Sequence, residues 1–157
     1  MNRLLAAALL SAALPAAAHD YTAGALTIDH PVIFAAPPTA RAAAGYMTLV
    51  NGGDAEDRLT GVSVATEGAQ AEIHRSEMRD GVMRMLPVQS VEIPAGGETV
   101  LAPGGYHVMI TGLPSGPAEG DRIDATLTFE TAGDVDVTFN VEPRPRSGAE
   151  GHGHAGH

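Results

Sequence analysis

Cysteine is missing from this chain, and lysine is missing too, so arginine supplies every basic side chain apart from histidine. Without cysteine the chain has no thiolate, which excludes the blue copper sites of electron-transfer proteins because those sites bind copper through a thiolate. The absence fits an oxidising compartment, where a free thiolate is open to oxidation and a thioether is the more durable soft donor. Soft metal ligands in this protein would therefore be methionines.

Positive charge is scarce, and long apolar runs are absent. The chain has 9 Lys+Arg against 19 Asp+Glu, which gives a net charge of -10. So acidic a chain argues against nucleic acid and anionic lipid as partners. No stretch reaches the roughly 20 apolar residues that a membrane-spanning helix needs. We therefore expect no membrane insertion of the mature protein.

The N-terminus has the organisation of a signal peptide. Arg3 supplies a positive charge, residues 4–14 form a short apolar segment, and Ala16-Ala17-Ala18 offers a cleavage site. Residues 1–18 are therefore expected to be removed, and an uncleaved N-terminal anchor is the alternative. This pattern predicts an exported protein, with the bacterial periplasm as its destination.

The mature chain is organised as one domain followed by a tail. Residues 19–142 are enough to bury a core. Residues 143–157 are polar, and we expect them to be disordered. The tail contains His152, His154 and His157, a cluster of imidazoles that suits Cu(II) or Zn(II) as an auxiliary metal site.

The body has the pattern of many short strands divided by turns. Apolar or alternating runs are separated by Gly-, Pro-, Asn- and Asp-rich turn signals, and no run shows a sustained helical period. This predicts an all-β fold, a β-sandwich or Greek-key barrel. The strands are expected at residues 25–28, 46–50, 59–64, 71–77, 82–88, 99–101, 107–111, 122–130 and 135–141.

Two short segments of the body contain paired histidine and methionine residues. The four candidate metal ligands are His74, Met85, His107 and Met109. Two imidazoles and two thioethers form a soft, neutral ligand set, which suits Cu(I) better than the hard, oxygen-seeking cations. The alternative is structural, because methionines commonly fill gaps in a core. Met47, which alternates with polar neighbours, is assigned to the core in this way.

The first segment is expected to form a hairpin around Asp80-Gly81, the strongest short hairpin signal. With these two residues as the loop, Ser76 faces Met85, and His74 becomes a diagonal neighbour of Met85. The period of two places His74, Ser76, Met78, Met83 and Met85 on one face. The other face is expected to contribute Ile73, Val82 and Leu86 to the core.

The second segment places two candidate ligands on one strand. His107 and Met109 are two residues apart, so they share a face. The preceding Pro103-Gly104-Gly105 turn would deliver the start of this strand toward the hairpin. A four-ligand site would close if the two segments adjoin.

The spacing of these residues resembles that of the periplasmic copper(I) chaperones called PCu(A)C, whose signature is H-x10-M-x21-H-x-M. The stretches DGVMRM, EIPAGG, PGGYHVM and HDYTAGALTIDHP are also similar to the family. The resemblance implies a cupredoxin-like β-sandwich that binds one Cu(I) through His74, Met85, His107 and Met109. It also implies delivery of that copper toward the assembly of respiratory oxidase copper centres. We therefore expect a non-enzymatic, monomeric carrier whose partner is an oxidase CuA subunit or another copper chaperone.

Other residues supply alternatives. Met78 and Met83 are possible auxiliary ligands in the hairpin. His19 would become the N-terminal residue after cleavage, and with His30 it would form the copper site of an oxidoreductase. A periplasmic buffer or resistance protein without a dedicated acceptor is a further alternative. The acidic residues Asp54, Glu56 and Asp57 are expected to form a solvated turn, with weak Ca²⁺ binding as the alternative.

Overall fold

The structure, a computed structural model, describes residues 20–145. This part of the chain is all-β, and within it no helix is long and apolar enough to cross a membrane. The strands are β1 (Tyr21–Ala23), β2 (Leu26–Phe34), β3 (Ala42–Asn51), β4 (Asp57–Val64), β5 (Gln70–Arg79), β6 (Val82–Pro87), β7 (Val91–Ile93), β8 (Glu98–Leu101), β9 (Tyr106–Thr111), β10 (Arg122–Phe129) and β11 (Gly133–Glu142).

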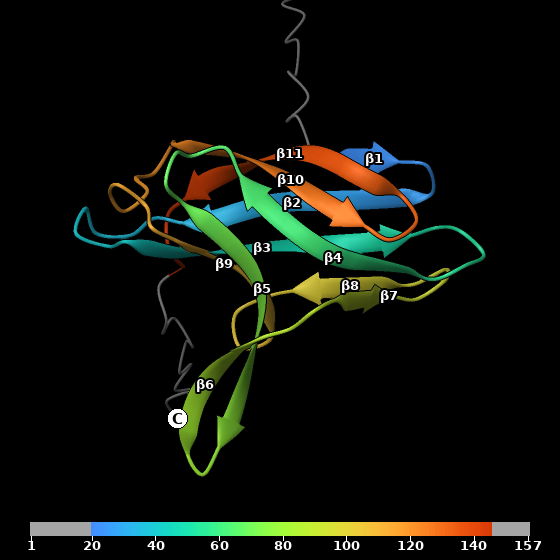
Figure 1. The fold of residues 1–157 in the computed structure, drawn as a ribbon, viewed down its shortest axis with the longest axis horizontal. Coiled ribbons are helices and arrows are strands. Elements are labelled where there is room, and N and C mark those ends of the chain that lie inside the picture. Colours follow the sequence, from blue (N-terminus) through green and yellow to red (C-terminus); the bar gives the residue numbers. More distant parts are fainter. Residues whose placement is uncertain (1–19, 146–157) are drawn as a thin grey trace, which may run out of the picture.

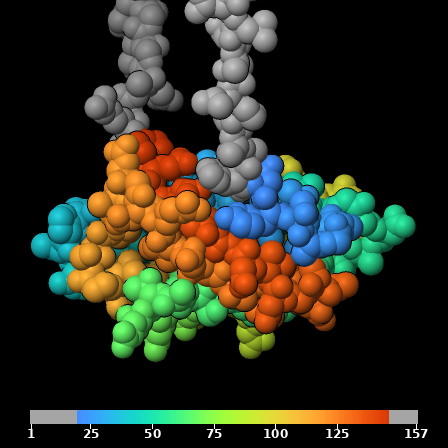
Figure 2. All heavy atoms as spheres, turned by 90° about the horizontal axis from the view of Figure 1, so that it is seen from above, coloured from blue at the N-terminus to red at the C-terminus, as the bar shows by residue number. Residues whose placement is uncertain are grey.

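The strands form one hydrogen-bonded path in the order β6-β5-β9-β3-β2-β11-β10-β4-β7, with β1 beside β2 and β8 beside β3. In the described residues all strand pairs are antiparallel except β2 with β11. The path folds over on itself, so that β4 comes to lie against β5 (Figure 1). Seen from above, β10 and β11 cover the side of the molecule turned away from the β5–β6 hairpin (Figure 2).

A single hydrophobic core lies inside this curled sheet. The strands bury alternate residues, as β3 does with Ala43, Met47 and Leu49, because side chains alternate between the two faces of a strand. Met47 is 3% exposed, so its assignment to the core is confirmed. Gly45 belongs to the same row, where a Cβ atom would lie only 2.8 Å from Cε1 of Phe139. Glycine here lets the two strands pack closely.

The predicted all-β fold is confirmed, but several strand boundaries differ. β1 and β7 were not expected; each has only three residues, which gives little alternation to recognise in the sequence. β2 continues to Phe34, whereas the sequence suggested an end at Ile28. The strand passes through His30-Pro31 by an irregularity in its pairing with β3, and His30 has a positive φ of 50°. Such a bulge allows a strand to continue past a proline.

The β5–β6 hairpin extends beyond the body of the molecule (Figure 1). Its loop is Asp80-Gly81, with φ angles of 53° and 76°, as a two-residue hairpin turn requires. The register has Ser76 opposite Met85, so the predicted pairing is confirmed. The prediction that Val82 and Leu86 join the core is wrong. They are 56% and 40% exposed, because the projecting hairpin has no layer behind it.

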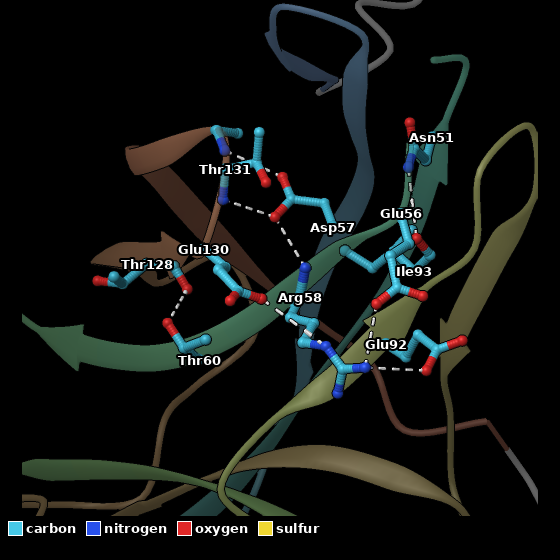
Figure 3. Close-up of polar contacts among 11 residues, drawn as sticks. Asn51, Glu56, Asp57, Arg58, Thr60, Glu92, Ile93, Thr128, Glu130 and Thr131 are labelled. Atoms are coloured by element: carbon cyan, nitrogen blue, oxygen red, sulfur yellow. Dashed lines mark hydrogen bonds and ion pairs between the residues drawn. The ribbon is translucent and has the colours of Figure 1, made fainter. Parts of the chain in front are cut away.

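The acidic loop before β4 also differs from its prediction. Asp57 is only 6% exposed, and its carboxylate accepts the backbone N–H groups of Thr131 and Ala132 at 2.8 and 3.0 Å (Figure 3). Asp57 therefore fastens the β10–β11 turn instead of lying in a solvated loop. Asp54 and Glu56 are exposed, as expected.

Candidate metal centre

The two candidate histidines lie side by side on neighbouring strands. His74 of β5 pairs directly with His107 of β9, and their ring centroids are 5.8 Å apart. Their neighbours Ile73 and Val108 point into the core at 4% and 0% exposure. Because side chains alternate along a strand, both imidazoles lie on the outer face of the sheet. The fold thus joins the two segments that the sequence left separate.

Hydrogen bonds determine which nitrogen of each ring is free. Nδ1 of His107 lies 3.2 Å from the carbonyl oxygen of Gly105. Nε2 of His74 lies 3.0 Å from Oε2 of Glu72. Both oxygens accept, so each of these nitrogens donates and the other nitrogen of the neutral ring keeps its lone pair. The two remaining nitrogens, Nε2 of His107 and Nδ1 of His74, are buried and have no hydrogen-bond partner among the described residues.

Burial favours the neutral form of His107. The residue is 2% exposed, and this desolvation lowers its pKa below the usual value. The nearby His74 also lowers the pKa, whereas the hydrogen bond to Gly105 raises it. The ring of Tyr46 lies against His107 with centroids 6.5 Å apart, and Phe34 follows at 5.5 Å from Tyr46. Tyr46 and Phe34 therefore form an aromatic wall beside His107.

The two candidate methionine ligands flank the histidine pair along the same face. Met109 lies two residues beyond His107 and pairs with Glu72 of β5. Met85 lies on β6 opposite Ser76, so it is a diagonal neighbour of His74 on the hairpin side. Met109 is half-buried, and Met85 is 52% exposed. One ion would contact both sulfur atoms only if both side chains bend toward the histidines, which their three rotatable bonds allow.

The remaining candidate ligands lie away from the histidine pair or outside the described residues. Met78 and Met83 face each other nearer the hairpin loop, at 64% and 50% exposure. Nε2 of His30 lies 3.1 Å from Oε1 of Glu142, and both side chains are exposed. The signal peptide, His19 and the tail histidines His152, His154 and His157 lie outside the described residues.

Sequence reasoning did not identify the residues that orient the rings. Glu72 stands two residues before His74, and this spacing places it on the same face of an alternating strand. That spacing could have identified Glu72 as a neighbour of His74 from the sequence. Gly105 acts through its backbone carbonyl, and Tyr46 comes from the distant strand β3, so neither carries a signal in the local sequence.

Comparison with known proteins identifies the family. The model of the LpqE-like lipoprotein family matches residues 26–141, nearly all of the described chain. The chain belongs to the LpqE-like family. A relative named as a lipoprotein, Lxx21020 of Leifsonia xyli subsp. xyli (strain CTCB07), is 31% identical over 106 residues. The match covers 64% of this chain and 64% of the relative, so this LpqE-like protein spans slightly less than two thirds of that relative's length.

Solved structures identify the fold of this LpqE-like protein as that of PCuAC domains. The copper-bound PCuAC domain from PmoF2 is 29% identical, with a TM-score of 0.66 over 80% of this chain and 99% of that domain. The CuI-DR1885 structure from Deinococcus radiodurans is 27% identical, with a TM-score of 0.55 over 82% of this chain and 84% of that one. The predicted PCu(A)C resemblance and cupredoxin-like fold are confirmed.

Proposed function

We propose that this LpqE-like protein is a periplasmic copper chaperone that binds one Cu(I) through two histidines and two methionines. The ligands are His74, Met85, His107 and Met109. The observation that carries the proposal is the histidine pair, because two adjacent imidazoles each hold one nitrogen in a hydrogen bond and keep the other buried and unpartnered. A buried polar atom without a partner is costly, and a metal ion would satisfy both nitrogens at once.

The chemistry of the donors supports Cu(I) in particular. Neutral nitrogen and thioether sulfur are soft or intermediate ligands, whereas Mg²⁺ and Ca²⁺ prefer oxygen and structural Zn²⁺ sites use thiolate or imidazole. A neutral donor set also adds no negative charge to offset a divalent ion. The copper-bound PmoF2 domain and the CuI-DR1885 structure share this fold, which adds support.

The residues around the ligands have separate tasks in this proposal. The Gly105 carbonyl and the Glu72 carboxylate orient the imidazoles, as acceptors behind metal-bound histidines commonly do. Tyr46 and the sheet keep water from His107. Met85 lies at the exposed edge, where an acceptor protein would approach.

The location and the acceptor are also part of the proposal. The signal-peptide pattern of residues 1–18 supports export to the periplasm, and the lipoprotein name of the family is consistent with export. We place delivery at the assembly of respiratory oxidase copper centres, with a CuA domain as acceptor and the carrier acting as a monomer. The observation in support is the PCu(A)C spacing of the four ligands.

X-ray absorption on the reduced mature protein tests the ligand set. We expect one Cu(I) with mixed nitrogen and sulfur neighbours. His107→Ala and Met85→Ala should each weaken Cu(I) binding strongly in competition with a chromogenic chelator. Met47→Leu is the control, because Met47 is buried in the core and should leave affinity nearly unchanged. A shell of only nitrogen and oxygen, or equal losses in all three variants, would contradict the ligand assignment.

A transfer assay tests the chaperone role separately. The Cu(I)-loaded protein is mixed with an apo CuA domain, and the metal content of each is measured after separation. We expect copper to move to the CuA domain faster than free dissociation allows. Retention of the metal would indicate a copper buffer instead.

A further inference from the structure

Three methionines on the projecting hairpin are not explained by packing. Met78, Met83 and Met85 are 64%, 50% and 52% exposed, whereas Met47 is 3% exposed in the core. Methionine commonly fills irregular gaps in a protein core. These three side chains fill none, since every residue of β6 is exposed and Met78 of β5 is exposed as well.

The three methionines lie together on one face of the hairpin. Met78 and Met83 are direct cross-strand partners, and Met85 follows Met83 by two residues on the same strand. Direct partners in an antiparallel pair have Cβ atoms about 4.5–5.5 Å apart, and diagonal neighbours are about 7–8 Å apart. Flexible thioether side chains at such spacing can place their sulfur atoms around one ion.

The two faces of the hairpin differ in their chemistry. The opposite face carries the pairs Arg75–Leu86, Glu77–Arg84 and Arg79–Val82, a mixture of charged and aliphatic side chains. On the methionine face no leucine, isoleucine or valine occurs between Ser76 and Met85. A merely apolar contact surface would accept aliphatic side chains equally well. The methionine face therefore presents three soft sulfur donors side by side.

The methionine face is continuous with the histidine pair. Met85 is a diagonal neighbour both of Met78, toward the loop, and of His74, toward the body. Met85 thus stands between the exposed methionine pair and the buried imidazoles. An ion bound at the tip of the hairpin would already contact a ligand of the inner site.

We propose that Met78 and Met83, with Met85 as a shared ligand, form a second, all-thioether Cu(I) site through which copper enters and leaves the histidine site. This inference rests on the proposed function, because it takes the histidine site as the resting place of the ion. Thioethers alone bind Cu(I) as soft, neutral donors, and the outer site lacks imidazole. It is therefore the weaker and more solvent-exposed of the two. The ion moves by ligand exchange and stays Cu(I), so no electron or proton is transferred.

Methyl NMR of the full mature chain tests the proposal, with the methionine methyl groups labelled and Cu(I) added without oxygen. During the first equivalent, the signals of Met85 and Met109 should shift while those of Met78 and Met83 stay in place. With further Cu(I), Met78 and Met83 should shift and Met85 should shift a second time. The signal of Met47 serves as the internal control.

A double variant, Met78→Leu with Met83→Leu, separates sulfur ligation from hairpin structure. Leucine keeps the size and apolar character of methionine, so the fold should be retained. The second shift of Met85 should be lost, while the first shift and the affinity of the inner site remain.

Three outcomes would overturn the outer site. These are immobile Met78 and Met83 signals, a shift of these signals together with the first equivalent, and a second Met85 shift that survives in the double variant. Failure of the proposed function is visible independently, because the first equivalent would then leave Met85 and Met109 unmoved.

Discussion

At the scale of single residues, the contact with Glu72 decides which ring nitrogen of His74 is free. Its carboxylate lies 3.0 Å from Nε2 of His74 and leaves Nδ1 free, whereas His107 has Nε2 free. The two histidines would therefore bind one ion through different ring nitrogens. Glu72 is also the direct cross-strand partner of Met109, so it is a neighbour of two of the proposed ligands.

Removal of this carboxylate should weaken metal binding. We expect Glu72→Ala to lower Cu(I) affinity by about 10–100-fold, the usual effect of losing a group that orients a metal-bound histidine. Chelator competition measures the affinity. Glu119→Ala removes the same charge from an exposed loop residue and should change little. An equal loss in both variants would point to net charge, and no loss in Glu72→Ala would contradict the orienting role.

His107 should make the stability of the metal-free protein depend on pH. Its pKa in the folded state is lowered by burial, whereas the unfolded chain has the ordinary value of about 6.5. Below that value the unfolded state binds a proton that the folded state does not, so the free energy of unfolding falls as the pH drops. Above it, the contribution of His107 is fully present.

Urea unfolding at pH 7.5 and pH 5.5 measures this effect. The wild type should lose more stability over this interval than His107→Gln, which has no imidazole at this position. Parallel losses in the two proteins would show that His107 titrates alike in the folded and unfolded states.

At the scale of elements, the β5–β6 hairpin fixes the position of Met85 relative to His74. Its loop residues Asp80 and Gly81 both have positive φ angles, and Gly81 has open space around its Cα. A substitution there would act through backbone strain and not through a clash. A shift of one residue in register would turn Met85 to the opposite face.

The variant Gly81→Val should therefore loosen the hairpin. A left-handed backbone conformation costs a side-chain-bearing residue roughly 1–2 kcal/mol, and a β-branched side chain is particularly unsuited to it. We expect faster amide exchange in β6 and weaker Cu(I) binding, with little change in thermal unfolding because β6 contributes nothing to the core. Asp80→Asn, which tolerates positive φ, is the control. Unchanged exchange and affinity in Gly81→Val would contradict this role of the loop.

The hairpin also shows what the sequence can and cannot predict. Its register follows from Asp80-Gly81 and from local alternation, which are properties of neighbouring residues. Its projection beyond the body does not, because the exposure of Val82 and Leu86 depends on whether another layer covers them. The pairing of β5 with β9 joins His74 to His107 across more than thirty positions in the chain. Only the matched spacing of the four ligands indicated that contact in advance.

At the scale of the whole molecule, the body and the tail offer different ligand chemistry. The body site would use thioethers, which do not titrate, together with two imidazoles. The tail contains His152, His154 and His157 and no methionine. Imidazoles must be neutral to bind a metal ion, so binding by the tail should decline below a pH of about 6.5.

Deletion of the residues after Pro145 should separate metal binding by the tail from metal binding by the body. We expect the shortened protein to lose a Cu(II) or Zn(II) equivalent and to keep its Cu(I) affinity. Titration of both proteins with each metal at two pH values measures this. Loss of Cu(I) binding on truncation, or acid-insensitive divalent binding by the full chain, would contradict the existence of two independent sites.

The alternation of side chains along β9 bears on whether the fold persists when the metal leaves. Val108 and Ile110 point into the core at 0% exposure, while His107 and Met109 lie on the other face, so the residues that hold the fold together are separate from the proposed ligands. Proteins whose metal supplies the folding energy come apart when the metal leaves. The hydrophobic core of the described residues contains none of the proposed ligands, so we expect the fold to persist when the metal leaves. Under the proposed function, each copy would then serve many cycles of loading and unloading.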